Sequence, residues 1–207
     1  DMCNSGSDPC WNRVTTAYGT VSGGYGNLAG SWAAAVSGGQ DNSATGTGAT
    51  VGGGGKNVAS GYIATVPGGG NNTAAGDYSF AAGRRAKALH TGSFVWADSA
   101  DVDFGSTAPD QFAVRANGGV TLVAGPGAWR LMPHPDSPNL IGGHSANNVA
   151  AEVYGATIGG GGAGGTDCGL YGGQNCWNNV TANYGTIGGG VANTASGDSA
   201  TASGGAV

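Results

Sequence analysis

One aliphatic position returns every fifteen residues in the first part of the chain, and a glycine-rich run follows it each time. An asparagine stands six residues after this position and an alanine stands eight residues after it, so three columns share one period. The aliphatic column contains Val21, Val36, Val51 and Val66. The other two columns contain Asn27, Asn42, Asn57 and Asn72, and Ala29, Ala44, Ala59 and Ala74. Near the end of the chain, Ile187, Asn193 and Ala195 keep the same offsets. This periodicity indicates a repeat protein.

A unit of fifteen residues predicts one coil of a β-solenoid. It is too short for a helical repeat of thirty or more residues, and its glycines and β-branched residues disfavour a helix. In a solenoid coil, two short strands are joined by tight corners, and successive coils stack about 4.8 Å apart. The predicted fold class is therefore all-β, a β-solenoid or β-roll.

Each column then receives a structural role. The four valines and Ile187 are expected to stack inward as the repeat core, and the alanines to keep a second inward position small. The asparagines are expected to occupy left-handed turns, which their side chains tolerate. An outward-facing column is expected at a fourth position, where residues of different chemical character share the period: Trp32, Thr47, Tyr62 and Asp77.

A longer repeat contains the shorter one. The run Cys10-Trp11-Asn12 returns as Cys176-Trp177-Asn178, so the chain begins a second copy of a long unit before it ends. Apolar residues around Asn117-Gly118-Gly119 predict a β-hairpin that interrupts the coils. The expected segments are a disulfide loop (1–17), β-roll repeats (18–92), a β-rich connector (93–138), a restart of the roll (139–162), a second disulfide loop (163–183) and further roll (184–207).

The four cysteines form two local pairs in sequence, Cys3 with Cys10 and Cys168 with Cys176. Two disulfides are the favoured interpretation over a zinc site, because zinc usually needs closer spacing with histidines nearby. Disulfides imply an oxidising setting, so we expect an extracellular or cell-surface protein.

Composition and charge narrow the partners. The chain has 207 residues with 45 glycines, and seven basic against twelve acidic residues give a formal charge of −5. An acidic chain with scattered bases is not expected to bind nucleic acid. Without a run of eighteen apolar residues, no membrane insertion is expected either. The expected partner is another copy of the chain.

The only carboxylate cluster in the sequence contains Asp98, Asp101 and Asp103, with Asp110 nearby. Such a hard, oxygen-rich cluster is a weak candidate for calcium, and an acidic solvated loop is the alternative. The basic run at 84–87 is interpreted as a solvated rim, with two alternatives: binding an anionic glycan, or pairing with these aspartates across protomers. No other cofactor is predicted. The serines, cysteines and histidines form no nucleophile-and-base pattern, so an enzyme is not expected.

The repeat phrases resemble a known family. The runs Ala49-Thr50-Val51-Gly52-Gly53-Gly54 and Asn57-Val58-Ala59-Ser60-Gly61 are similar to the head repeats of trimeric autotransporter adhesins and of related trimeric phage and surface fibres. The resemblance covers roughly 18–92 and 139–207, and it implies a left-handed parallel β-roll with three chains around one axis. The chain departs from that pattern in its fifteen-residue period and its cysteine loops.

These observations predict a non-catalytic structural segment of an extracellular fibre or filament, which assembles with itself through stacked coils. The alternative is an adhesin or tail-fibre module that binds a glycan or receptor through the connector and the cysteine loops. Ice binding would require a regular outward threonine ladder, which the column of Trp32 does not supply.

Overall fold

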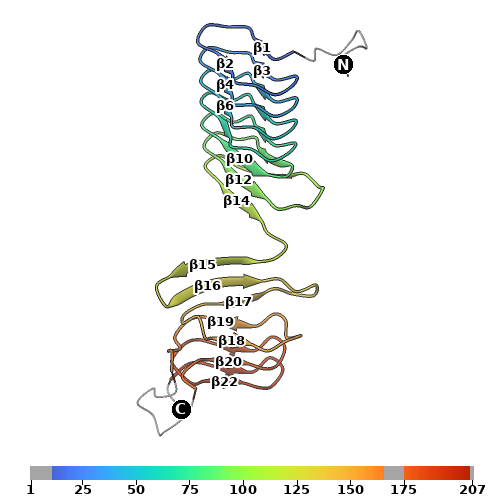
Figure 1. Cartoon of the computed structure of the whole chain (residues 1–207). Helices are drawn as coiled ribbons and strands as arrows, with labels where there is room; N and C mark the ends of the chain where they lie inside the picture. The colour runs from blue at the N-terminus through green and yellow to red at the C-terminus, as the bar shows by residue number, and fades with distance from the viewer. Residues whose placement is uncertain (1–10, 166–174, 206–207) are drawn as a thin grey trace. The chain divides into compact units, whose positions relative to one another are not determined.

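The computed structural model describes residues 11–165 and 175–205, and the elements in these ranges are all β-strands. The chain divides into two compact units, Asp1–Arg115 and Ala116–Val207. Each unit is a stack of coils (Figure 1), and each is described by itself. The predicted class, an all-β solenoid, is confirmed.

Unit 1 consists of two seven-stranded sheets with parallel pairing throughout. The first sheet contains, in order, β1 (Arg13–Val14), β3 (Leu28–Ala29), β5 (Ser43–Ala44), β7 (Val58–Ala59), β9 (Thr73–Ala74), β11 (Ala86–Ala88) and β13 (Phe104–Gly105). The second contains β2 (Thr20–Val21), β4 (Ala35–Val36), β6 (Thr50–Val51), β8 (Thr65–Val66), β10 (Phe80–Gly83), β12 (Phe94–Ala97) and β14 (Phe112–Arg115). Successive strands of the chain alternate between the two sheets, so each coil contributes one strand to each.

The fifteen-residue period sets the register between coils. Val21 pairs with Val36, Val36 with Val51, and Val51 with Val66. The alanine column is in register in the same way, from Ala29 to Ala74. Because the period matches one full coil, each residue of these coils lies next to the residue fifteen positions further along the chain, in the neighbouring coil.

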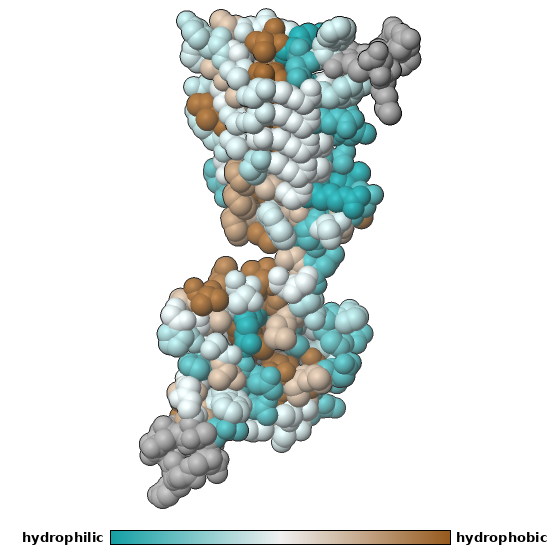
Figure 2. Space-filling view, in the orientation of Figure 1, coloured by the Kyte–Doolittle hydropathy of each residue, from teal (hydrophilic) through white to brown (hydrophobic). Residues whose placement is uncertain are grey.

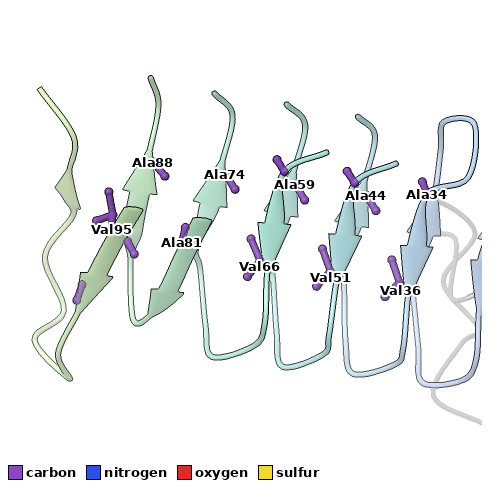
Figure 3. Close-up of a cluster of buried hydrophobic side chains, with 14 of the residues drawn as sticks. Ala34, Val36, Ala44, Val51, Ala59, Val66, Ala74, Ala81, Ala88 and Val95 are labelled. Carbon is purple, nitrogen blue, oxygen red and sulfur yellow. The ribbon is translucent and has the colours of Figure 1, made fainter. Parts of the chain in front are cut away.

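The core of unit 1 is made of small aliphatic side chains (Figure 3). Val36, Val51 and Val66 are fully buried, whereas Val21 is partly buried because it lies in the end coil. The alanine column is fully buried too, and a third buried column precedes the valines by two positions; it contains Ala34, Ala49 and Ala64. The inward roles of the valines and alanines are thus confirmed, and Ile187 is also fully buried, in unit 2.

The role predicted for the asparagines is wrong. Asn27, Asn42, Asn57 and Asn72 are at most 1 % exposed and form a buried ladder. The Oδ1 of Asn42 accepts the backbone N–H of Asn57 at 3.0 Å, and the Nδ2 of Asn57 donates to the carbonyls of Gly53 and Gly69 at 2.9 and 3.0 Å. The left-handed residue is the one before the asparagine, for example Lys56 at φ 55°. The asparagine side chain therefore satisfies the backbone of the corner that its neighbour forms.

The roll of unit 1 continues further than predicted. β10, β12 and β14 pair in parallel, so the roll extends through Phe112–Arg115, into the segment 93–138 that was expected to be the connector. The coil that contains Ala86 is one residue short, and the N–H of Ala86 donates to Asn72 Oδ1 at 2.9 Å across 14 residues. The shortened coil keeps the stacking although the repeat phrase is lost.

Unit 2 begins with an antiparallel hairpin, but its turn lies at residues 125–126, so the prediction of a hairpin around Asn117-Gly118-Gly119 is wrong. Its first sheet contains, in order, β15 (Val120–Ala124), β16 (Gly127–Met132), β17 (Asn139–Ile141), β19 (Thr157–Ile158), β21 (Thr186–Ile187) and β23 (Thr201–Ala202). The pairs β15–β16 and β16–β17 are antiparallel, and the later pairs are parallel. The second sheet contains β18 (Asn148–Val149), β20 (Asn179–Val180) and β22 (Thr194–Ala195).

The coils of unit 2 accommodate a long insertion. Asn178 donates its backbone N–H to Asn147 Oδ1 across 31 residues, at 2.9 Å, whereas Asn193 donates to Asn178 Oδ1 across 15 residues, at 3.1 Å. The asparagine ladder therefore connects Asn147 directly to Asn178, and the roll resumes there, within the segment expected to be a disulfide loop. In unit 1 the roll likewise already contains Arg13–Val14.

The two predicted disulfides stay predictions. Cys3, Cys10 and Cys168 lie outside the described residues, and Cys176 is fully buried beside the resumed asparagine ladder.

Candidate functional site

A shallow groove of about 470 Å³ lies on unit 1 beside Trp96. Trp96 points outward because it alternates with the buried Val95 and Ala97 in β12. The groove is lined by Gly69, Gly70, Asn71, Gly83, Arg84, Trp96, Ala97, Asp98 and Ser99. Glycines form part of the wall, and a Cβ at Gly69 would meet the carbonyl oxygen of Gly83 at 2.0 Å. Their missing side chains leave the tryptophan as the largest apolar group of the groove.

The charged groups of the groove are held in place by ion pairs. Arg84 contacts Asp101 at 3.0 Å and donates to the carbonyl of Ser99 at 3.0 Å. Asp98 accepts from Arg115 Nε at 2.9 Å, and the two side chains of this pair are only 15 % and 16 % exposed. An exposed aromatic ring beside fixed polar groups can bind a planar apolar face that carries hydroxyls at its rim.

The predicted calcium ligands do not come together. Asp98 pairs with Arg115, while Asp101 and Asp103 pair with the basic run at 84–87; Arg85 Nε, for example, lies 2.8 Å from Asp103. Within the described ranges, no three His, Cys, Asp or Glu side chains form a group that could hold a metal ion. The basic run therefore pairs with these aspartates within one chain, which accounts for both charged clusters without a metal.

A stacked phenylalanine ladder lies on the outward face of the second sheet of unit 1. Phe80 and Phe94 have ring centroids 4.7 Å apart at 3°, and Phe94 and Phe112 4.9 Å apart at 20°. Phe112 is 73 % exposed. The ladder does not follow the repeat period, because the spacing from Phe80 to Phe94 is shorter than fifteen residues and that from Phe94 to Phe112 is longer. In the regular coils the same outward column contains Thr20, Ala35, Thr50 and Thr65, so an interrupted threonine column does exist beside the valines.

Unit 2 carries an exposed apolar face on its hairpin. Leu122 pairs with Trp129, and Val120 with Leu131, so these side chains share one face. Leu122 is 66 % and Trp129 60 % exposed, and a groove of about 350 Å³ lies beside them. The hydrophobic colouring of Figure 2 gathers near the hairpin of this unit. Such a face is typical of a surface that contacts another molecule.

Comparisons with protein-family models, curated proteins and solved structures find no match to the chain. Within the described ranges, no helix is long and apolar enough to cross a membrane.

Proposed function

We propose that the chain is a non-catalytic structural segment of an extracellular fibre that assembles with itself. The observation that carries the proposal is the in-register stack of coils, tied together by backbone hydrogen bonds and by the buried asparagine ladder. In unit 1 this ladder extends from Asn12 to Ala86. A stack in which each coil pairs with the next is stiff along its axis and is extended by adding coils.

The regular coils supply stiffness without a large core. Their inward side chains are valine and alanine, so each coil buries little apolar surface. The asparagine side chains compensate, because each one satisfies backbone groups of two corners that would otherwise be buried without partners. Removing the ladder would leave buried backbone groups without hydrogen-bond partners along the regular coils.

Two features support self-association and an extracellular setting. The phenylalanine ladder of unit 1 and the hairpin face of unit 2 present apolar side chains to solvent, which suits contacts with other copies, including the trimer that the resemblance implies. The paired cysteines suit an oxidising compartment.

Negative-stain or cryogenic electron microscopy of the purified native material tests the proposal. We expect fibres with a regular axial repeat. Discrete stubby particles with a broad tip would contradict the fibre and would favour a binding module instead.

The groove beside Trp96 favours a second candidate function, the binding of a glycan. Its exposed indole ring suits stacking on a sugar face, and Arg84, Asn71 and Asp98 place polar groups at the rim. Glycan-array binding by the purified protein tests this candidate. We expect Trp96→Ala to abolish binding, and Trp32→Ala, which removes an indole 56 % exposed elsewhere on unit 1, to leave it unchanged. Equal binding by both variants would contradict the assignment.

A further inference from the structure

Two pairs of tyrosine rings lie in contact at the corners of neighbouring coils, one pair in each unit. In unit 1, the ring centroids of Tyr62 and Tyr78 are 5.4 Å apart and the ring planes meet at 88°. In unit 2, the ring centroids of Tyr154 and Tyr184 are 5.2 Å apart and the planes meet at 83°. In both pairs the edge of one ring therefore faces the other ring, with nearly the same geometry.

The backbone holds both pairs in the same way. The N–H of Tyr78 donates to the carbonyl of Tyr62 at 2.8 Å, and the N–H of Tyr184 donates to the carbonyl of Tyr154 at 2.9 Å. Tyr78 and Tyr184 both have φ 57°, so each occupies the left-handed position of its corner. The same local fold therefore places a tyrosine beside a tyrosine twice in the molecule.

A polar side chain also fixes the first tyrosine of each pair. The N–H of Tyr62 donates to Asp77 Oδ1 at 2.9 Å, and the N–H of Tyr154 donates to Asn183 Oδ1 at 3.2 Å. Asp77 and Asn183 directly precede the second tyrosine of their pair. Because the two corners are hydrogen-bonded at this point, the two phenol side chains leave the backbone from adjacent positions.

The paired rings are accessible from solution, and in unit 2 their hydroxyl groups converge. Tyr78 is 61 % and Tyr184 52 % exposed, and their partners are less exposed but not buried. The charge of Tyr184, and then a hydrogen bond between the two side chains, raise the pKa of Tyr154. Tyrosyl radicals couple mainly through the carbons ortho to the hydroxyl group. Rings whose hydroxyl groups approach each other therefore bring the reactive carbons close together.

We propose that each pair is a site of oxidative cross-linking, at which a haem peroxidase with hydrogen peroxide joins the two rings as dityrosine. Each phenol loses one electron and one proton from its hydroxyl group, and the two electrons and two protons reduce hydrogen peroxide to two waters. The two phenoxyl radicals then form a carbon–carbon bond between ortho carbons. The hydrogen on each of these carbons moves as a proton to the oxygen of the same ring, which restores both phenols.

The link joins neighbouring coils of one chain. The strands that follow the tyrosines are paired, β8 with β10 in unit 1 and β19 with β21 in unit 2. Two groups held in contact react as one molecule, so coupling within the chain is faster than coupling between copies. The inference does not depend on fibre assembly, because both rings of a pair belong to one chain.

Oxidation of the whole chain by a haem peroxidase and hydrogen peroxide, at low protein concentration, tests the proposal. Chains that migrate singly in a denaturing gel should show dityrosine fluorescence and a mass lower by two hydrogen atoms for each link. Peptide mapping should join Tyr62 to Tyr78 and Tyr154 to Tyr184. The yield per chain should stay constant over about a tenfold dilution of the protein, as a reaction within one chain requires.

Phenylalanine variants assign each link to its pair. Tyr78→Phe keeps the ring but lacks the hydroxyl group that forms the radical, so it should abolish the link of unit 1 and keep that of unit 2. Tyr184→Phe should do the reverse. The control is Tyr18→Phe, because Tyr18 is exposed but its ring contacts Trp32, at 5.6 Å between centroids. This control should keep both links.

Three results would overturn the proposal. The first is the absence of dityrosine from the oxidised chain. The second is a set of links that join only different copies and become rarer on dilution. The third is a set of cross-linked peptides in which Tyr18 occurs as often as the paired tyrosines, because exposure alone would then decide which rings react.

Discussion

Unit 1 contains two kinds of coil, those with the fifteen-residue repeat and those without it. Comparing them shows which features parallel stacking needs and which belong to the fifteen-residue repeat alone. In the regular coils, from Thr20 to Ala74, the spacing is fifteen residues and asparagines connect the corners. In the later coils, the spacing first shortens, from Phe80 to Phe94, and then lengthens, from Phe94 to Phe112. Both kinds keep a buried inward column, with Ala81 and Val95 following the valines.

Different interactions stabilise the two kinds of coil. The asparagine ladder ends at Asn72, whose Oδ1 accepts the N–H of Ala86. Beyond that point, stacked phenylalanines and arginine–aspartate pairs take over on the outside. Parallel stacking therefore needs only a small inward side chain in register, while the buried asparagine makes the fifteen-residue corner possible.

The largest effect is expected at the closely stacked glycines of the regular coils. Gly54 has φ +81°, and a Cβ there would meet the carbonyl oxygen of Gly69 at 2.0 Å. Gly54→Ala should lower the free energy of unfolding by about 4 kcal/mol or more, because the coils would have to separate. Chemical denaturation measures the loss. The control, Gly55→Ala, has ordinary φ and its nearest neighbour at 3.8 Å, so a similar loss there would contradict the explanation.

Loss of one asparagine should be the next most damaging change. Asn57→Ala removes two hydrogen bonds from Nδ2 and leaves the buried N–H of Asn72 without its acceptor. We expect the free energy of unfolding to fall by about 3 kcal/mol. The control is Asn71→Gly, because the exposed Asn71 has φ 57°, which glycine adopts readily. Equal losses in both variants would show that the ladder is not what stabilises the corner.

In the later coils, the pair between Arg115 and Asp98 should matter to a smaller degree. Arg115 also donates to the carbonyls of Ala100 and Val102, and so it holds the loop between β12 and β13. Arg115→Met should cost about 2 kcal/mol in thermal or chemical unfolding, because the pair is mostly buried. No change in stability would mean that this loop is held by other contacts.

The smallest effect is expected for the exposed pair of Arg84 and Asp101, whose side chains are 46 % and 62 % exposed. Asp101→Asn should change the free energy of unfolding by less than about 0.5 kcal/mol, and added salt should reduce even that difference. The same denaturation assay measures it. A loss as large as that of Arg115→Met would contradict the ranking by burial.

The sequence predicted the solenoid, its register and its inward columns, because an unbroken period places Val36, Val51 and Val66 above one another. It did not predict the asparagine ladder, since the same spacing suits a turn residue and a buried side chain equally well. The end of the roll in unit 1 was also predicted too early. The shortened coil at Ala86 and the wider spacing to Phe112 interrupt the period, although the coils continue to stack. The sequence suggested calcium at Asp98 because it did not show that Asp98 pairs with Arg115, a residue that only the folded coils bring close to it.

X-ray diffraction from aligned native material measures whether the coils of the protein stack at the spacing of paired strands. We expect a strong meridional reflection at about 4.8 Å, from the spacing of paired strands along the fibre axis. The absence of that reflection, or its appearance on the equator, would contradict the stacked-coil rod.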